Sequence, residues 1–310
     1  MSIVVENLTK KYGTQRAVDN ISFEVKTGEV LGFLGPNGAG KTTTMKIITC
    51  FMAPSDGDIK VGGLSIHEHQ DEIKKKIGYL PENNPLYYDM LVLDYLEFVA
   101  NLQGVPKDKI QKRIAEMVVM TGLNVEKHKK IGELSKGYRQ RVGLAQAMIH
   151  DPEILILDEP TTGLDPNQIV EIRKLIKELG KEKTVVLSTH ILPEVEATCD
   201  RIMIINNGKI VADGTSDMLR KQAQGQEILR VQISEASDRD SLISSLSELE
   251  SVSLVDPVEG NSNTFIINSS ENLSSRKPIF NLCVQNNWVL TEMTPIETKL
   301  EDIFRKLTTN

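Results

Sequence analysis

One short stretch of the chain combines backbone flexibility with a single positive charge. It reads GPNGAGKTT over residues 35 to 43 and fits the pattern G-x-x-x-x-G-K-[ST]. In that pattern backbone amides cradle phosphate groups, the lysine reaches the β- and γ-phosphates, and the hydroxyl ligates Mg²⁺. The residues that we expect to bind a nucleotide here are Gly35, Pro36, Asn37, Gly38, Ala39, Gly40, Lys41, Thr42 and Thr43.

The flanks of this loop indicate how it is positioned. Residues 30 to 34 form a short apolar run, which is typical of a strand buried on both faces. Residues 42 to 51 carry apolar side chains at helical spacing. Because a helix N-terminus presents unpaired amides and the positive end of a dipole, a strand–loop–helix unit favours an anion at the loop.

Two adjacent carboxylates lie at the end of a second short apolar run, EILILD, which is residues 153 to 158. Asp158 ends this predicted strand at the sheet edge where ligands bind in parallel α/β folds, and it can hold Mg²⁺ directly or through water. Glu159 comes next, and a carboxylate there can polarise a water that attacks the γ-phosphate. The pair therefore indicates hydrolysis of a nucleoside triphosphate.

The composition limits the kinds of partner. The 310 residues carry 36 Lys and Arg against 43 Asp and Glu, a formal net charge of −7. We expect no nucleic-acid partner, because broad nucleic-acid binding usually needs a basic footprint. No apolar stretch approaches the roughly 18 residues needed to cross a bilayer, and the N-terminus has no signal-peptide core. The expected location is cytoplasmic. Cys50, Cys199 and Cys283 are expected as small buried side chains rather than a disulfide framework.

Strand and helix patterns alternate over the first two thirds of the chain, which predicts an α/β fold with a mainly parallel sheet. A helical block at about residues 86–150 interrupts the alternation as a subdomain. The HEHQD stretch from His67 is interpreted as a solvated polar turn. A polar connector, KQAQGQE, divides the chain into domains at 1–219 and 220–310. The second domain has the order βαββαβ plus a last helix, which predicts a small ferredoxin-like α+β domain.

A further segment, ELSKGYRQR, contains a second helix start that can meet an anion. Ser135 can cap a helix that begins near Lys136, and Gly137 allows a close backbone approach. Together with the loop and the carboxylate pair, this segment resembles the signature segment of the ABC ATPase family. Four more residues resemble the family's other motifs, in the family's order. Tyr12 resembles the aromatic residue that stacks on adenine, and Glu82 in GYLPE lies in a segment that resembles the loop to the helical subdomain. Asp165 in TTGLDP resembles the D-loop, and His190 in VVLSTH resembles the switch histidine that contacts the γ-phosphate.

The resemblance covers residues 1 to about 220 and implies a P-loop NTPase of the ABC ATPase fold, with a mainly parallel core sheet, an antiparallel β part and a helical subdomain. Two positions depart from the family pattern. Glu82 replaces the usual glutamine, and the signature reads Leu-Ser-Lys-Gly-Tyr instead of Leu-Ser-Gly-Gly-Gln. Glu82 can still reach a metal or a water. The expected metal ligands are Thr42, Asp158 and Glu82, and the expected catalytic residues are Lys41, Glu159 and His190.

The family also implies partners and a cycle. Two such chains, here a homodimer, close on two ATP molecules with Mg²⁺, and Ser135 and Gly137 of one chain cover the nucleotide held by the other. Closure is passed to separate integral membrane permease subunits through a groove near residues 82 to 88 and the helices that follow. The protein would thus be peripheral on the inner face of the cell membrane.

The C-terminal extension, ending TPIETKLEDIFRKLT, resembles that of type-2 exporter ATP-binding subunits. Within that class, IGYLPENNPLYYDMLV and the overall length are most similar to the gliding-motility-associated subunits. We therefore expect the motor subunit of an exporter. The alternatives are an importer subunit, which would more typically carry an all-β extension, and a non-transport ABC ATPase of translation or DNA repair. A single phosphate loop, the lack of heptads and the acidic balance disfavour the latter.

Overall fold

The computed structural model describes residues 1–224, 227–234, 238–258, 263–270, 273–296 and 300–308. The chain divides into two compact units, one formed by Met1–Ser216 with the chain from Leu307, the other by Asp217–Lys306. Helix α8 (Ser216–Gln224) runs through the expected boundary at residue 219, so residues 221–224 of the predicted connector are helical. The chain's last turn belongs to the first unit, where Asn206 Nδ2 donates to the Leu307 carbonyl at 3.1 Å.

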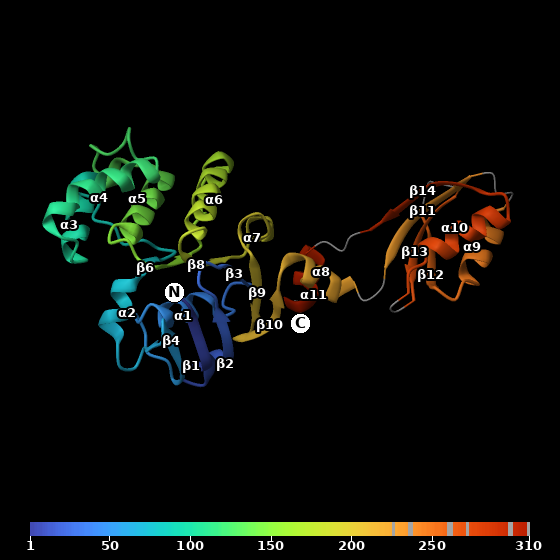
Figure 1. Cartoon of the computed structure of the whole chain (residues 1–310), viewed down its shortest axis with the longest axis horizontal. Coiled ribbons are helices and arrows are strands. Elements are labelled where there is room, and N and C mark those ends of the chain that lie inside the picture. The colour runs from blue at the N-terminus through green and yellow to red at the C-terminus, as the bar shows by residue number, and fades with distance from the viewer. Residues whose placement is uncertain (225–226, 235–237, 259–262, 271–272, 297–299, 309–310) are drawn as a thin grey trace. The chain divides into compact units, whose positions relative to one another are not determined.

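The first unit is built on a six-stranded sheet of order β10-β9-β3-β8-β7-β6, in which all neighbours are parallel except β10 and β9 (Figure 1). Every residue of β3, β7 and β8 is buried, as continuous apolar runs predict for central parallel strands. The strands are β3 (Val30–Leu34), β6 (Ile77–Leu80), β7 (Ile154–Asp158), β8 (Thr184–Thr189), β9 (Arg201–Asn206) and β10 (Lys209–Gly214).

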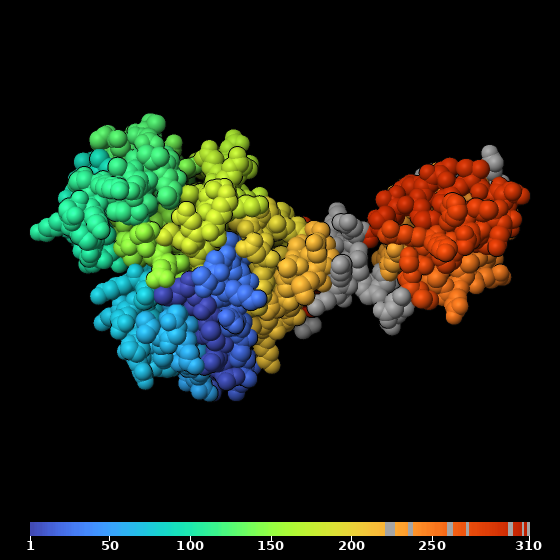
Figure 2. Space-filling view, viewed as in Figure 1, coloured from blue at the N-terminus to red at the C-terminus, as the bar shows by residue number. Residues whose placement is uncertain are grey.

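A second, antiparallel sheet has the order β2-β1-β4-β5. Its buried side chains form one core with the apolar side chains of β3 and of helix α1 (Lys41–Ile48), so α1 is packed by both sheets. In the space-filling view, the gold β9–β10 segment lies beside the blue β1–β2 segment (Figure 2), where Asp19 N donates to the Gly208 carbonyl at 2.9 Å. The strands are β1 (Ile3–Tyr12), β2 (Gln15–Val25), β4 (Asp56–Val61) and β5 (Leu64–Ser65).

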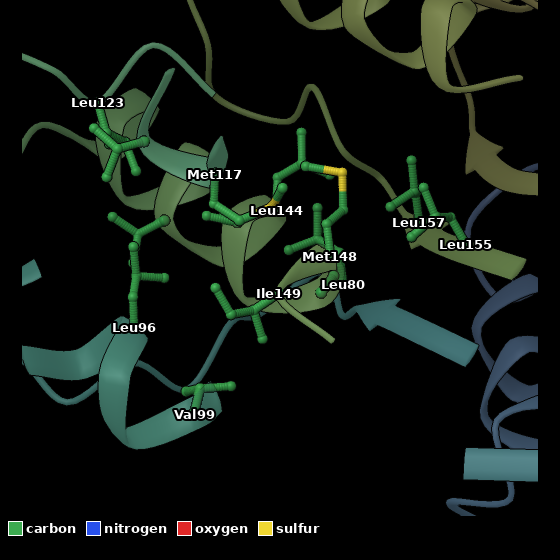
Figure 3. Packing of buried hydrophobic residues seen from close by; sticks show 14 of the residues in the cluster. Leu80, Leu96, Val99, Met117, Leu123, Leu144, Met148, Ile149, Leu155 and Leu157 are labelled. Carbon is green, nitrogen blue, oxygen red and sulfur yellow. The ribbon is translucent and has the colours of Figure 1, made fainter. Parts of the chain in front are cut away.

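The expected helical subdomain is present between β6 and β7. The side chains predicted to share a face, Ile110, Ile114, Met117 and Val118, are all buried and belong to one cluster with side chains of the neighbouring helices. Figure 3 shows part of this cluster, with Met117 among side chains of other helices such as Leu96 and Leu144. The elements are α3 (Val92–Leu102), α4 (Lys107–Met120), the short 3₁₀ helix η1 (Ile131–Glu133) and α5 (Lys136–Met148).

The remaining helices of this unit are α1 (Lys41–Ile48), α2 (Gln70–Lys76), α6 (Pro166–Gly180) and α7 (Leu192–Thr198). Helix α2 was not predicted, because Ile73 is its only buried side chain and a single apolar residue gives no periodicity. The predicted polar turn is therefore correct only up to His69, after which the chain is helical. No helix within the described residues is both long and apolar enough to span a membrane.

The second unit has an antiparallel sheet of order β12-β13-β11-β14, with α9 and α10 on the connections. This order, with the sequence βαββαβ, confirms the predicted ferredoxin-like arrangement. Its own apolar cluster includes Val231, Leu242, Phe265, Ile267 and Ile279. The elements are β11 (Ile228–Ser234), α9 (Arg239–Ser247), β12 (Val252–Pro257), β13 (Thr264–Ser269), α10 (Arg276–Gln285) and β14 (Val289–Pro295), followed by α11 (Leu300–Thr308). Of the three cysteines, which are all free, Cys283 is buried and the other two are partly buried.

Candidate functional site

The GPNGAGKTT loop joins β3 to the start of α1, as its flanks predict. Gly38 and Gly40 have φ angles of 79° and 112°, which favour glycine. A Cβ on Gly40 would collide with the Ala17 carbonyl, and one on Gly35 with the Ile205 carbonyl. The glycines therefore serve both the curl of the loop and its close packing against neighbouring strands.

A pocket of about 330 Å³ opens at this loop. It unites the sequence-predicted residues 37 to 43 with Glu82, Glu159 and His190, which come from three other segments of the chain. The full lining is Ala17, Asn37, Gly38, Ala39, Gly40, Lys41, Thr42, Thr43, Glu82, Glu159, Thr162 and His190.

Lys41 supplies the positive charge of the pocket and is only 6% exposed. Its Nζ donates to the Gly35 carbonyl at 2.8 Å and to the Pro36 carbonyl at 3.3 Å, and it lies 3.9 Å from Glu159 Oε1. Burial lowers the pKa of the Lys41 ammonium, while the nearby carboxylates of Glu159, Asp158 and Glu82 oppose this shift. In the described part of the chain the hydrogen bonds of this poorly solvated ammonium go to two carbonyls, so it is suited to an incoming phosphate.

Asp158 lies at the base of the site with no exposed surface. Its Oδ1 accepts hydrogen bonds from Thr42 Oγ1 at 3.3 Å and from Ser188 Oγ, whereas its Oδ2 has no hydrogen-bond partner among the described residues. A buried carboxylate oxygen without a partner is costly unless a cation or water meets it. The donor set of Asp158, Thr42 and nearby Glu82 fits a hard, oxygen-preferring cation such as Mg²⁺.

Glu159 follows β7 with a φ of 50°, a left-handed conformation that is uncommon outside glycine. Its amide donates to Ser188 Oγ at 3.1 Å, and its carboxylate lies 3.0 and 3.1 Å from His190 Nδ1. Thr162 Oγ1 donates to the same carboxylate at 3.4 Å. This places a buried acceptor beside a half-exposed imidazole at the pocket wall, an arrangement that can orient a water and a γ-phosphate.

Tyr12 ends β1 with its side chain 48% exposed. Its hydroxyl donates to Met52 Sδ at 2.9 Å, and Lys10 Nζ lies 5.7 Å from its ring centroid. It does not line the 330 Å³ pocket in the part of the chain that the structure describes. Its role in stacking an adenine stays a prediction.

The signature segment begins α5, and Ser135 Oγ caps this helix by accepting from Tyr138 N at 3.3 Å, as predicted. Asp165 likewise caps α6 in a reciprocal pair with Gln168. A Cβ on Gly137 would meet the Gln168 side chain, so the signature and D-loop segments adjoin within one chain. None of Ser135, Gly137 and Asp165 lines the phosphate-loop pocket of the described structure.

Sequence reasoning missed Ser188, which bonds both to the side chain of Asp158 and to the backbone of Glu159. Ser188 lies one strand away, on β8, and its register opposite Asp158 is set by the parallel pairing of β7 with β8. The only available signal was its place two residues before His190 at a predicted strand end.

The comparisons agree with this geometry. A family model described as ABC transporter matches residues 18–162. The bacitracin transport ATP-binding protein BcrA of Bacillus licheniformis is 35% identical over 311 residues, covering 99% of this chain and 98% of that protein. The linearmycin resistance ATP-binding protein LnrL of Bacillus subtilis is 39% identical over 232 residues, 74% of each chain. The solved dimeric structure of the ATP-binding cassette MJ0796 in a post-hydrolysis state, bound to ADP and Pi, matches with a TM-score of 0.63 and 28% identity, over 69% of this chain and 98% of that chain.

The sheet order and the phosphate-loop pocket define a P-loop NTPase of the ABC ATPase fold. The chain belongs to the ABC transporter family, as one of its ATP-binding subunits. It is an ATPase, and ATP is its nucleotide.

Proposed function

We propose that this subunit drives an exporter of the type-2 class. The observation that carries the proposal is the second unit, an α+β module where an importer subunit would more typically have an all-β one. Similarity to the bacitracin transport protein over almost the whole of both chains also supports it. The subunit then works at the cytoplasmic face of the cell membrane, held there by permease subunits.

The proposed catalytic roles follow from the pocket. Lys41 and the loop backbone hold the phosphates, and the adenine stacks on Tyr12. Mg²⁺, held by Thr42, Asp158 and Glu82, would neutralise charge on the β- and γ-phosphates. Glu159 accepts a proton from the attacking water. His190, whose Nδ1 lies beside the Glu159 carboxylate, contacts the γ-phosphate that this water attacks.

The proposed site is completed by a second chain. Ser135 and Gly137 lie at the capped N-terminus of α5. Within the described residues, neither of them lines the phosphate-loop pocket of the same chain. A helix N-terminus favours an anion. The γ-phosphate held by the partner's loop is the anion that fits, and Asp165 lies beside this contact. The solved cassette MJ0796 is a dimer of the same fold.

The proposed permease contact lies on the helical subdomain near residues 82 to 88. Tyr87, Tyr88 and Phe98 each expose more than a third of their side chains there, and the rings of Tyr87 and Phe98 meet edge to face at 5.7 Å. A pocket of about 370 Å³ in the same place is lined partly by residues 82 to 86 and by Tyr88. Exposed aromatic side chains beside a hollow favour an apolar partner segment.

Purification of the tagged chain from native membranes tests the transporter assignment. We expect integral membrane proteins to co-purify, and Phe98→Arg to reduce their yield. Val125→Arg, at an apolar site on the same subdomain that is 80% exposed against 41% for Phe98, serves as the control for adding a charge. Co-purification with ribosomes or DNA-repair proteins instead, or with no membrane protein at all, would contradict the proposal.

We propose more narrowly that the exporter serves gliding motility, which rests on the stretch IGYLPENNPLYYDMLV and on the length of the chain. Disrupting the chromosomal copy in its own host should abolish colony spreading, and an intact copy should restore it while one carrying Glu159→Gln does not. Normal spreading of the disrupted strain would remove this narrower assignment and leave the exporter assignment untouched.

A further inference from the structure

A buried carboxylate outside the nucleotide pocket contacts the segments that carry the proposed catalytic residues. Glu194 lies in the first turn of α7 and is 3% exposed. Its Oε2 accepts hydrogen bonds from Thr161 Oγ1 at 2.6 Å and from Thr189 Oγ1 at 3.2 Å. Its Oε1 lies 3.6 Å from Arg173 Nη2. Each partner thus belongs to a different segment of the chain.

Two of these partners lie close in the sequence to the proposed catalytic residues. Thr161 is two residues after Glu159, and Thr189 immediately precedes His190. Because side chains alternate along a strand, Ser188 turns to Asp158 while Thr189 turns to Glu194. Arg173 lies on α6, the helix that Asp165 begins. One carboxylate therefore connects the segment after β7, the end of β8 and helix α6.

Packing of α7 alone does not require this carboxylate. Leu192 and Val195 already bury apolar side chains from the same helix. A buried carboxylate carries a desolvation cost that an apolar residue at the same place would avoid. The carboxylate adds directional hydrogen bonds that an apolar side chain could not make. Two hydroxyls donate to the same oxygen, and this fixes their segments relative to each other.

We propose that Glu194 is a positioning residue for hydrolysis. Through Thr161 and Thr189 it holds the backbones next to Glu159 and His190, so that the 3.0–3.1 Å contact between these two side chains forms. This inference rests on the proposed roles of Glu159 and His190. Weakening the contact to Glu194 should slow the chemical step and leave nucleotide binding, which depends on Lys41 and the loop, nearly unchanged.

The test compares Thr161→Val with Thr161→Ser in the full chain. Both substitutions lose part of a side chain that is 4% exposed, but only valine removes the hydroxyl that donates to Glu194. We expect Thr161→Val to lower kcat about tenfold, at the low end of the 10–100-fold typical for residues that orient a site. Thr161→Ser should retain most of the kcat. The Kd of the variants for a non-hydrolysable ATP analogue should stay within about twofold of the wild type.

Two further variants connect the effect to Glu194 itself. Glu194→Gln should lower kcat to a similar degree, whereas Glu196→Gln on the same helix should not. The double variant Thr161→Val with Glu194→Gln should be no slower than the slower single one, because both changes break the same contact. Thermal unfolding of every variant shows whether it is folded at the assay temperature.

Three results would overturn the inference. The first is a wild-type kcat in Thr161→Val, and the second is a fall in kcat in Thr161→Ser that equals the fall in Thr161→Val. The third is a loss of affinity for the ATP analogue that parallels the fall in kcat. Glu159→Gln, measured in the same assay, distinguishes a failure of the proposed role of Glu194 from a failure of the proposed role of Glu159. If Glu159→Gln is inactive and Thr161→Val is not, only the role of Glu194 fails. If Glu159→Gln itself hydrolyses ATP normally, the role of Glu159 and this inference fail together.

Discussion

At the scale of single residues, charge is concentrated at the base of the pocket. Lys41, Asp158 and Glu159 are all almost fully buried, and within the described residues the one ion pair of Lys41 is the 3.9 Å approach of its Nζ to Glu159 Oε1. Such a group of incompletely paired charges stabilises a folded protein weakly. It is understandable as a site kept ready for a phosphate and its cation, which would supply the missing partners.

Lys41→Ala should reduce ATP hydrolysis by at least about 100-fold, because it removes the cation that meets the phosphates. Nucleotide affinity should fall as well, since the contact is made in the bound ground state too. A steady-state ATPase assay and a fluorescent-nucleotide titration measure the two effects. Lys46→Ala, on the same helix but outside the pocket lining, is the control. Turnover near the wild-type value in Lys41→Ala would show that this loop is not the hydrolytic site.

At the scale of elements, the loop between β3 and α1 depends on where each glycine lies. Gly38 and Gly40 both have positive φ, so an alanine at either position carries a backbone strain of about 1–2 kcal/mol. Only at Gly40 would the added Cβ also collide with the Ala17 carbonyl, since nothing lies within 4 Å of the corresponding position at Gly38. A substitution at Gly38 therefore tests backbone strain alone, whereas one at Gly40 tests strain together with a steric collision.

We expect Gly40→Ala to destabilise the chain more than Gly38→Ala, and to abolish nucleotide binding by moving the loop off β2. Urea unfolding followed by circular dichroism gives the two free energies of unfolding, and a nucleotide titration gives the affinities. Equal stabilities for the two variants would mean that the loop does not pack on Ala17 as described.

At the scale of the whole molecule, the proposed shared site makes ATP a bridge between two chains. Glu159→Gln keeps the size of the side chain but removes the charge that activates water, so hydrolysis should slow by about 100-fold or more. The variant should sediment as a dimer with Mg-ATP and as a monomer with ADP, which lacks the γ-phosphate. Adding Ser135→Arg should restore the monomer by placing a bulky side chain at the proposed contact. A variant that stays monomeric at saturating ATP, with its permease subunits present, would refute the shared site.

The second unit should also fold without the first. A fragment of residues 227–296 contains all four strands of its sheet and the apolar cluster between sheet and helices. It should unfold cooperatively on heating. Phe265→Ala removes a ring with no exposed surface and should cost about 3–5 kcal/mol, whereas Phe280→Ala, 55% exposed, should cost little. A fragment without a cooperative transition would show that the unit needs the rest of the chain.

Much of the site was determined by the sequence alone, because its parts are local. The phosphate loop, the Asp158–Glu159 pair and the Ser135 cap each need only neighbouring residues and a strand or helix beside them. Apolar periodicity likewise predicted the parallel core, the helical subdomain and the ferredoxin-like order of the second unit. Helix α2 and the helical part of the predicted connector were missed, because their few apolar residues give no period that could be recognised.

Tertiary structure alone decided how these local parts meet. The pairing of β7 with β8 brings Ser188 to Asp158, and the fold of α7 brings Glu194 to Thr161 and Thr189. The Ser188–Asp158 and Thr161–Glu194 contacts join residues 30 and 33 positions apart, through the pairing of two strands and the packing of a helix. Such contacts cannot be recognised from residue spacing in the sequence. Which polar side chains become partners depends on how the strands and helices pack, and the separation of the partners along the chain follows no fixed pattern.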